Sequence, residues 1–323
     1  MEKPLVSVII PSYNHAPFLR ERLDSILQQD YPNFEVFVLD DCSPDNSREI
    51  IEQYSSNPHI GQIVFNEQNT GNTFCQWHRG ISMAKGKYVW IAESDDVAEP
   101  SFLSVLVAEL ERNPNAVLAY SYSKVIDQDS RVIYEDRSLV ATPFRIKVYR
   151  GNDYIMHYQL RDNCIYNASM VVFRRDVYPR ISPKFMEHRY CGDWFFWTCA
   201  CQYGDVIEVR EPLNSFRQHT NKVTVKSQKG DKNWIDAGLM MTDLVEELQL
   251  NNYQRRSLRF LWNRRLMRSK IVDDKMKIMR ACPAIFKSDW CDYPYFKWAK
   301  NFGFLQLRSR MVLTYFNVPI VNH

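Results

Sequence analysis

Residues 88–96 read Tyr-Val-Trp-Ile-Ala-Glu-Ser-Asp-Asp, an apolar run that ends in three carboxylates within four positions. The apolar half, 88–92, is typical of a buried strand. Carboxylates this close together repel one another unless a cation lies among them, and ligand sets of oxygen alone favour hard divalent ions such as Mg²⁺ or Mn²⁺. In open α/β sheets, ligands bind at the carboxyl ends of the strands. The simpler alternative is an acidic turn before the next helix, because Glu99 and Pro100 follow.

Two earlier apolar runs also end in polar residues. Residues 6–10 (Val-Ser-Val-Ile-Ile) lead into Pro-Ser-Tyr-Asn at 11–14. Residues 36–39 (Val-Phe-Val-Leu) lead into Asp-Asp-Cys-Ser-Pro-Asp at 40–45. If these runs are strands of one parallel sheet, their polar ends lie at one edge. A shared site there is favoured over three unrelated turns.

The order of the predicted elements indicates the fold class. Apolar residues at helical spacing predict helices over 17–29, 48–55, 73–84 and 101–112, and these alternate with strands over 6–10, 36–39, 63–65 and 88–92. Such alternation predicts a mainly parallel sheet with helices on both faces. Further on, strands are expected over 117–125, 131–134, 169–174, 206–209 and 213–217, a hairpin turn at 127–131, and a helix over 190–203.

The motifs at 6–14, 40–45, 69–72, 80–86 and 93–96 resemble, in their order and spacing, those of family 2 glycosyltransferases. The resemblance is strong over about residues 4–120, thinner over 150–221 and absent beyond. It implies an α/β fold of the GT-A type, which is a Rossmann-like sheet flanked by helices, and the use of nucleotide-activated sugars. We expect a catalytic domain over 1–221. A lysine-rich loop, 221–232, and a helical appendage would make up a C-terminal region over 222–323.

Transfer of a sugar from a nucleoside diphosphate needs a cation for the departing diphosphate. Asp95 is the expected metal ligand, with Glu93 beside it at a position where the family usually has Asp. By resemblance, His219 falls in an Arg-x-His pattern of the family and would be a second ligand, which favours Mn²⁺ over Mg²⁺. The alternative for a single histidine is a purely structural role.

The acceptor hydroxyl is a poor nucleophile and needs a base. Asp193 is the candidate catalytic base, because the family carries an acidic residue at the matching place. Apolar neighbours at 194–197 should raise its pKa. The alternative is that Asp193 caps the helix that follows it, in which case Glu187 is the next candidate.

The donor nucleotide is expected between the first two strands. Asp41 would accept the N–H of a uracil-type base, and Asp40 or Asp45 would share that role or cap the helix at 47. Arg217 would bind a phosphate. Arg79 would reach the diphosphate or form a solvated salt bridge, and Asp96 would contact the sugar donor or only orient its neighbours. The full set of predicted donor-binding residues is Pro11, Tyr13, Asn14, Asp41, Arg79, Glu93, Ser94, Asp96 and Arg217.

Composition sets broader limits. The 323 residues are 45% hydrophobic and 24% charged, with net charge +3. That charge is uneven, because residues 1–221 carry −7 and 222–323 carry +10. The eight cysteines show no zinc-finger spacing, and the chain has neither an evident signal peptide nor an apolar run of about 18 residues. We therefore expect a cytoplasmic protein with reduced cysteines.

The predicted helix over 253–271 raises the question of a membrane surface. Leu258, Trp262 and Leu266 form an apolar stripe, yet the arginines spread around the whole circumference. Peripheral contact with the inner face of the membrane and packing against the rest of the protein explain this pattern equally well.

Together these features predict a metal-dependent, inverting glycosyltransferase that uses a UDP-sugar and either Mn²⁺ or Mg²⁺. Inversion follows from the resemblance, and the acceptor would be a glycan or a lipid-linked saccharide, as in cell-surface polysaccharide synthesis. The alternative is a degenerate GT-A domain that only binds nucleotide or serves as a scaffold. Dinucleotide and P-loop sites are excluded because their glycine-rich loops are missing, and no nucleic-acid-binding motif is present. A nucleotidyltransferase would also need a glycine-rich loop after the first strand.

Overall fold

The structure is a computed structural model that describes residues 3–135, 145–219, 231–270 and 272–286. The chain forms two compact units. The first comprises Met1–Gly151, Asn167–Ile181 and Tyr203–His219, and the second comprises Asn152–Tyr166, Ser182–Gln202 and the chain from Thr220 onward. The second unit therefore includes two segments that precede residue 221, the predicted domain boundary, and that boundary stays a prediction. Most of the loop expected at 221–232 lies outside the described residues.

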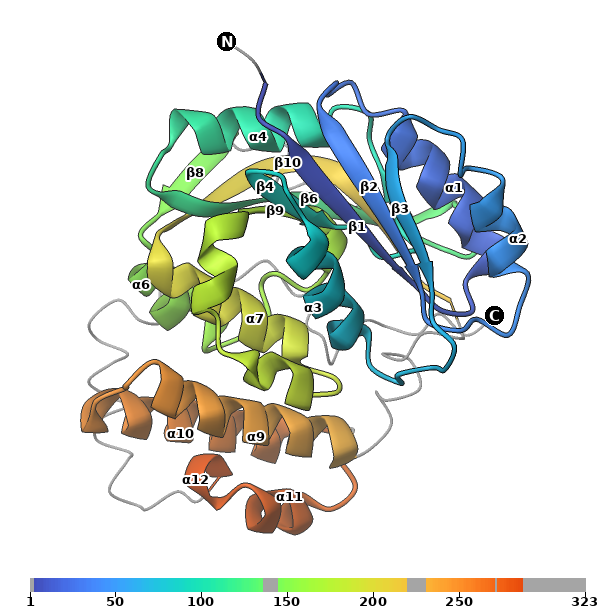
Figure 1. Ribbon diagram of the computed structural model, residues 1–323. Coiled ribbons are helices and arrows are strands. Elements are labelled where there is room, and N and C mark those ends of the chain that lie inside the picture. Colours follow the sequence, from blue (N-terminus) through green and yellow to red (C-terminus); the bar gives the residue numbers. More distant parts are fainter. Residues whose placement is uncertain (1–2, 136–144, 220–230, 271, 287–323) are drawn as a thin grey trace. The chain divides into compact units, whose positions relative to one another are not determined.

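The first unit is built on one mixed sheet (Figure 1). The strand order is β3-β2-β1-β4-β9-β6-β10-β5, with β7 beside β6 and β8 beside β10. The strands are β1 Val6–Ser12, β2 Phe34–Asp40, β3 Ile60–Phe65, β4 Tyr88–Ile91, β5 Val97–Ala98, β6 Ala116–Ile126, β7 Val132–Tyr134, β8 Ile146–Tyr149, β9 Val171–Arg174 and β10 Asp205–Arg217.

Strands β3, β2, β1 and β4 run parallel to one another, and so do β6 and β10. Strand β9 lies antiparallel between β4 and β6. The predicted α/β class with a parallel central sheet is confirmed. The two late strands expected at 206–209 and 213–217 are one strand, β10, whose register shifts on either side of Pro212. A proline cannot donate to the sheet, which explains an irregularity at this place.

The helices of the first unit follow the predicted spacing. They are α1 Ala16–Leu27, α2 Ser47–Glu52, α3 Thr73–Met83 and α4 Phe102–Arg112, with 3₁₀ turns at Ala168–Met170 and Arg175–Arg180. A further 3₁₀ turn, Cys201–Tyr203, spans the chain boundary at which the second unit gives way to the first. The hairpin turn predicted at 127–131 connects β6 to β7, where the Asp127 N–H donates to the Arg131 carbonyl.

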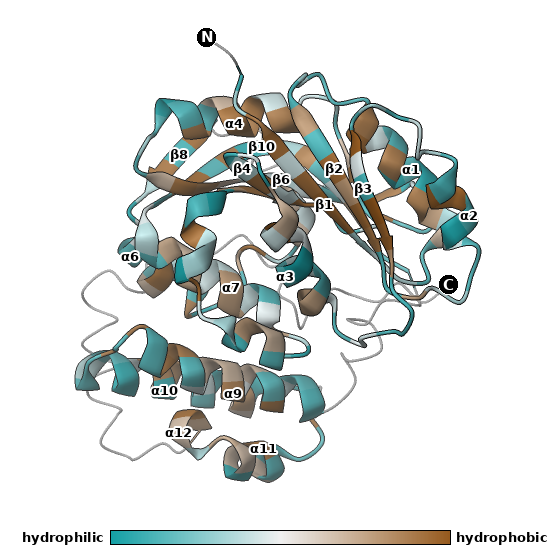
Figure 2. Ribbon diagram, in the orientation of Figure 1, coloured by the Kyte–Doolittle hydropathy of each residue, from teal (hydrophilic) through white to brown (hydrophobic). Residues whose placement is uncertain are grey.

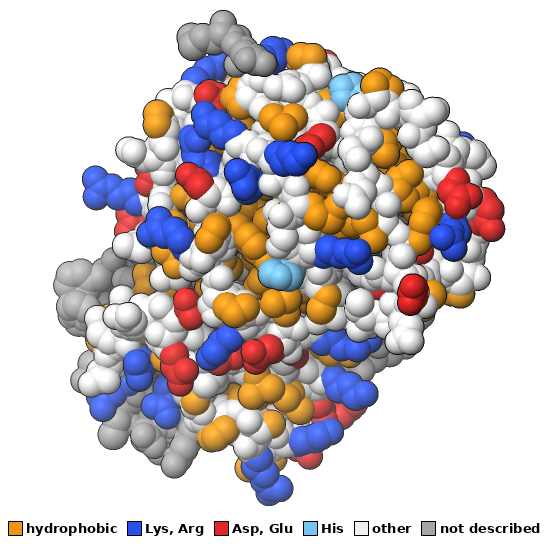
Figure 3. Space-filling view, viewed as in Figure 1, with side chains coloured by type: hydrophobic (Ala, Val, Ile, Leu, Met, Phe, Trp, Pro, Cys, Tyr) orange, Lys and Arg blue, Asp and Glu red, His pale blue; other side chains and the backbone are white. Residues whose placement is uncertain are grey.

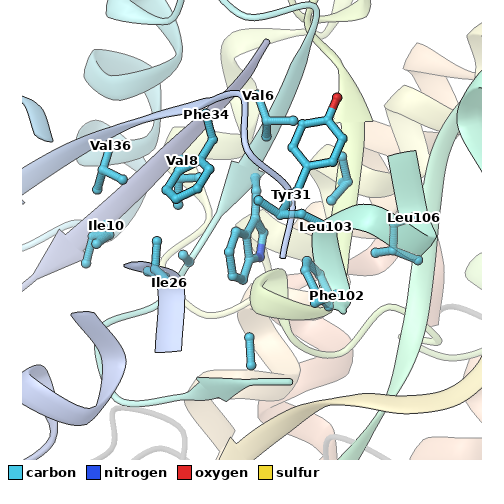
Figure 4. Close-up of a cluster of buried hydrophobic side chains, with 14 of the residues drawn as sticks. Val6, Val8, Ile10, Ile26, Tyr31, Phe34, Val36, Phe102, Leu103 and Leu106 are labelled. Atoms are coloured by element: carbon cyan, nitrogen blue, oxygen red, sulfur yellow. The ribbon is translucent and has the colours of Figure 1, made fainter. Parts of the chain in front are cut away.

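Alternate residues of β1 belong to opposite faces of the sheet. Val6, Val8 and Ile10 lie in the same buried cluster as Phe102 and Leu106 of α4 (Figure 4). The central strands are accordingly hydrophobic along most of their length (Figure 2). On the other face, Ile9 meets Gly80 of α3, where a Cβ atom would lie 2.3 Å from Ile9 Cγ2. The missing side chain of Gly80 thus lets α3 approach β1 closely.

The second unit is helical and has its own core. Its helices are α7 Gly192–Ala200, α9 Asp231–Glu247, α10 Asn252–Arg268, α11 Lys275–Ala281 and α12 Pro283–Phe286, with a π-turn at Ile155–Gln159 and a 3₁₀ turn at Pro183–Glu187. The short helix α6, Gly151–Tyr154, begins with the last residue of a first-unit segment and continues into the second unit.

Every residue of α7 is buried. The Trp194 and Trp262 rings lie 5.8 Å apart, and their indole N–H groups donate to the carbonyls of Gln159 and Leu160. The predicted stripe of Leu258, Trp262 and Leu266 on α10 is buried, so these three side chains pack within the protein, and peripheral membrane contact stays a prediction.

In the described part of the chain no helix has the length and apolar character needed to cross a membrane. Every cysteine that the structure describes is a free thiol, and Cys291 lies outside the described residues.

Candidate active site

The predicted site lies at one edge of the sheet because the register aligns its strands. Ser12 at the end of β1 pairs with Asp40 at the end of β2, and Ile9 pairs with Ile91, the last residue of β4. The polar segments that follow these strands therefore start side by side. Strand β10 ends at Arg217, which pairs with Ile126 at the end of β6.

A histidine–aspartate–histidine cluster lies within this edge. His15, Asp95 and His219 each offer one ligand atom, and these atoms all lie within 4.8 Å of one another. His219 Nε2 is 3.1 Å from Asp95 Oδ2, and both residues are buried. Two imidazole nitrogens and one carboxylate oxygen suit Mn²⁺ and other transition metals better than Mg²⁺, which prefers oxygen ligands alone. The donor set thus fits the implied metal.

His15 was missed in the sequence analysis, although it directly follows Asn14 at the same strand end. It precedes the first turn of α1, where its carbonyl accepts from Phe18 and Leu19. Its ring nitrogen Nδ1 lies 2.8 Å from Ser94 Oγ, and its ring lies 5.4 Å from that of His219. Ser94 is thereby placed to orient the imidazole of His15, as hydrogen-bonding partners commonly do for histidines at metal sites.

The other two carboxylates of the acidic turn have different surroundings. Glu93 accepts from the indole N–H of Trp77 at 3.0 Å, while its own backbone N–H donates to Ser169 Oγ. Asp96 is fully buried and accepts from Asn167, Ser169 and the Arg217 backbone N–H. Asp96 therefore acts as an anchor for several segments, and its predicted contact with the donor stays a prediction.

Arg217 is also engaged within the protein. Its guanidinium donates to the carbonyls of Asp95 and Asp127 and to Ser130 Oγ, and it forms a 2.6 Å ion pair with Glu21. The side chain is completely buried. These contacts favour a structural role in holding the acidic turn, and diphosphate binding by Arg217 stays a prediction.

The loop after β2 is organised around Asp41. This buried carboxylate accepts from the side chains of Asn66 and Gln76 and from both the backbone and hydroxyl of Thr70. The exposed Arg79 donates to Asn66 at 2.6 Å, so the two predicted donor-binding residues belong to one network.

The first strand end presents the remaining predicted donor residues. Pro11 is buried in the sheet, whereas Tyr13 is exposed. Asn14 has a positive φ of 57° and donates its backbone N–H to Ser43 Oγ. Such conformations are tolerated by asparagine and concentrate at functional turns.

Asp40, Asp45 and Cys42 shape the turn after β2. Asp40 accepts from the backbone and hydroxyl of Ser43. Asp45 accepts from the backbone N–H groups of Ala16 and Ser47, where α1 and α2 begin, which supports the capping alternative for that residue. Cys42 has a φ of 61° and is exposed.

The candidate base belongs to the second unit. Asp193 follows the first residue of α7, and the N-cap is Cys191, so the alternative of an N-capping aspartate is wrong. Burial raises the pKa of Asp193 from 3.8 to about 7, although the Trp194 backbone N–H and Asn163 oppose the shift. The expected upward shift of the pKa is confirmed. Glu187, the next candidate, is exposed.

The chain is similar in sequence and in fold to known proteins. The family model described as Glycosyl transferase family 2 matches residues 7–181. An uncharacterized glycosyltransferase of Haemophilus influenzae is 29% identical over 226 residues, covering 68% of this chain and 68% of that protein. The putative teichuronic acid biosynthesis glycosyltransferase TuaG of Bacillus subtilis is 38% identical over 94 residues, covering 29% of this chain and 37% of that protein.

Two solved structures share the fold. Staphylococcus aureus TarS (residues 1–349) in complex with UDP-GlcNAc superposes with a TM-score of 0.63 at 18% identity, over 90% of this chain and 78% of that one. Mannosyltransferase PcManGT from Pyrobaculum calidifontis, in complex with GDP-Man and Mn²⁺, gives 0.55 at 14% identity, over 94% and 82% of the two chains.

Proposed function

This chain belongs to glycosyl transferase family 2, and we propose that it is a metal-dependent, inverting enzyme that transfers a sugar from a UDP-sugar to a hydroxyl group. The observation that carries the proposal is the cluster of His15, Asp95 and His219 at the edge where β1, β4 and β10 end. The acceptor would be a glycan or a lipid-linked saccharide. The kinship with a protein named for teichuronic acid biosynthesis supports a role in cell-surface polysaccharide synthesis.

In this proposal the acceptor oxygen attacks the anomeric carbon of the donor. The bond from that carbon to the diphosphate oxygen breaks, and the nucleoside diphosphate leaves with the electron pair. Asp193 takes the hydroxyl proton, for which a pKa of about 7 is well matched near neutral pH. His15, Asp95 and His219 would hold a divalent cation, which would supply positive charge to stabilise the departing diphosphate.

The chemistry of the strand ends supports the donor side of the proposal. Asp41, Asn66 and Arg79 form one hydrogen-bonded network, and the exposed Tyr13, which follows β1, offers a ring for a base. Structural neighbours were crystallised with UDP, UDP-GlcNAc and GDP-Man. We expect UDP because Asp41 can pair with a uracil N–H.

A donor screen tests the proposal. Purified protein is incubated with UDP- and GDP-sugars, and nucleoside diphosphate release is measured with Mn²⁺, with Mg²⁺ and with EDTA. We expect release from a UDP-sugar that needs Mn²⁺ and that EDTA abolishes. Nucleotide binding without release from any donor, with acceptor mixtures present, would instead favour the degenerate, binding-only alternative.

Peripheral membrane contact remains part of the proposal, supported by the six arginines of α10. On the face drawn in Figure 3, however, Lys and Arg side chains are interspersed with Asp and Glu. Co-sedimentation with vesicles of anionic or neutral lipid decides the point: binding only to anionic vesicles, lost at high salt, is the expected result.

A further inference from the structure

An arginine occupies the apolar stripe of α1. Positions 16, 19, 22, 23 and 26 form the buried face of this helix, and four of them are apolar: Ala16, Leu19, Leu23 and Ile26. The fifth is Arg22, which is 0% exposed. Placing a cation in the core costs free energy unless a nearby negative charge offsets it.

The donors of Arg22 have no hydrogen-bond acceptor among the described residues: Nε, Nη1 and Nη2 are all buried and unbonded. The guanidinium instead lies over the ring of Trp90 on β4, 4.8 Å from its centroid. Trp90 lies on the strand that leads into the acidic turn, three residues before Glu93.

The charges that face Arg22 are those of the acidic turn. Burial lowers the pKa of Arg22 to about 10, and the negative charges of Asp96, Asp95 and Glu93 oppose that shift. It stays protonated at neutral pH. Arg217, the other buried arginine at this turn, is neutralised by its ion pair with Glu21.

These charges balance when a divalent ion binds. Glu93, Asp95 and Asp96 bring three negative charges, and Arg22 offsets one. Two negative charges remain, which is the charge that one divalent cation neutralises. Asp95 is the member of the three that lies in the metal cluster.

We propose that Arg22 is a positioning residue that serves as the buried counter-ion of the acidic turn. It holds the turn together before the metal binds. It also lowers the affinity of the turn for metal, because it leaves two negative charges, which one divalent ion neutralises. The inference rests on the metal site of the proposed function. Arg22 touches neither substrate nor metal and acts only through the carboxylates.

The test is Mn²⁺ binding without nucleotide, followed by the electron paramagnetic resonance signal of free Mn²⁺, in wild type and in Arg22→Met. Methionine keeps an unbranched stem and suits the apolar surroundings, but it removes the charge. One neighbouring charge shifts the proton affinity of a carboxylate about ten- to a thousandfold. We therefore expect Arg22→Met to bind Mn²⁺ at least about tenfold more tightly.

Thermal unfolding gives a second readout. Without metal, Arg22→Met should melt below wild type, because the buried carboxylates lose their counter-ion. Saturating Mn²⁺ should remove most of that difference. An arginine that acts only through packing would give the same loss with and without Mn²⁺.

Two further variants serve as controls. Arg20→Met removes a charge from the same helix at an exposed site, where Arg20 bonds to Gln53, and it should leave Mn²⁺ affinity unchanged. Arg22→Lys keeps the charge and should bind Mn²⁺ within about twofold of wild type.

Folded Arg22→Met with wild-type or weaker Mn²⁺ affinity would overturn the inference while leaving the metal site intact. No Mn²⁺ binding by wild type would overturn both. If Arg22→Met does not fold without metal, recovery by Mn²⁺ supports the inference. If it does not fold in either condition, Arg22→Lys decides: a folded protein of wild-type affinity supports the counter-ion role, and failure to fold overturns it.

Discussion

The acidic turn contains three carboxylates whose surroundings differ sharply. Asp95 faces His219, Glu93 faces the indole N–H of Trp77, and Asp96 is enclosed by three donors. Carboxylates within four consecutive positions can therefore serve different purposes, because their surroundings decide the role of each. Substitutions in this turn should have correspondingly different effects.

Asp95→Ala removes the carboxylate of the metal cluster. We expect Mn²⁺ binding to be lost and sugar transfer to fall by several orders of magnitude, since a metal contributes several kcal/mol to stabilising developing charge. Folding should persist, because the change relieves repulsion within the turn. Binding is checked by titration with Mn²⁺ and folding by circular dichroism. Asp129→Ala, an exposed aspartate of the 127–131 turn, is the control. Normal, EDTA-resistant turnover by Asp95→Ala would refute the metal role.

Asp193→Asn keeps the shape of the side chain but cannot accept a proton. We expect transfer to fall at least about a hundredfold, the usual scale for a lost general base, with unchanged nucleotide affinity. In wild type, kcat/KM should rise with pH up to about 7, where Asp193 ionises. The exposed Asp153→Asn in the same unit should behave as wild type. Lost nucleotide affinity with normal turnover would instead assign Asp193 to the donor.

The same substitution has a pH-dependent effect on stability. The pKa of Asp193 is raised from 3.8 to about 7 in the folded protein, so its contribution to stability is present below about pH 4 and is lost as pH rises through 7. Asparagine does not titrate. Asp193→Asn should therefore gain stability relative to wild type between pH 4 and 8, by up to about 4 kcal/mol. Urea unfolding of wild type and Asp193→Asn at pH 4 and at pH 8 checks this. An equal difference in unfolding free energy between the two proteins at both pH values would contradict a buried carboxylate.

At the scale of elements, the close approach of α3 to β1 depends on Gly80. Gly80→Ala would place a Cβ atom 2.3 Å from Ile9 Cγ2, and the resulting overpacking should cost about 1–3 kcal/mol of unfolding free energy. Gly61→Ala is the matched control, because its Cβ atom would meet its nearest neighbour at 3.7 Å. Urea unfolding of both variants is the measurement. Equal stability of the two would show that α3 shifts at no cost.

At the scale of the whole molecule, the proposed metal ligands belong to one unit and the proposed base to the other. His15, Asp95 and His219 are in the first unit, whereas α7 and the C-terminal helices are in the second. Mn²⁺ alone should slow amide exchange in the segments after β1, β4 and β10, because a ligand at 100 times its Kd adds about 2.7 kcal/mol to the unit that binds it. Helices α9 and α10 should be unaffected. Protection spread evenly over both units would contradict this assignment.

The order of the elements in the first unit could be predicted from the sequence, because alternating apolar runs and turn residues are local signals. Strands β1, β2 and β4 and helices α1, α3 and α4 were predicted within a few residues of their bounds. The family, and with it the expectation of a metal at Asp95, also came from short motifs that each lie within a few consecutive positions.

The residues that lie together in the candidate site could be identified only from the tertiary structure. His15 and Arg22 lie on one helix, at its start and on its buried face, and neither stands out in a linear pattern. Pairing of β1 with β4 brings the start of that helix to Asp95, and β10 brings His219 from 124 positions away. Likewise, the helices after 231 share a unit with 152–166 and 182–202, which no local signal revealed. Long-range pairing depends on burial summed over many residues, so it is a property of the whole fold and of no single segment.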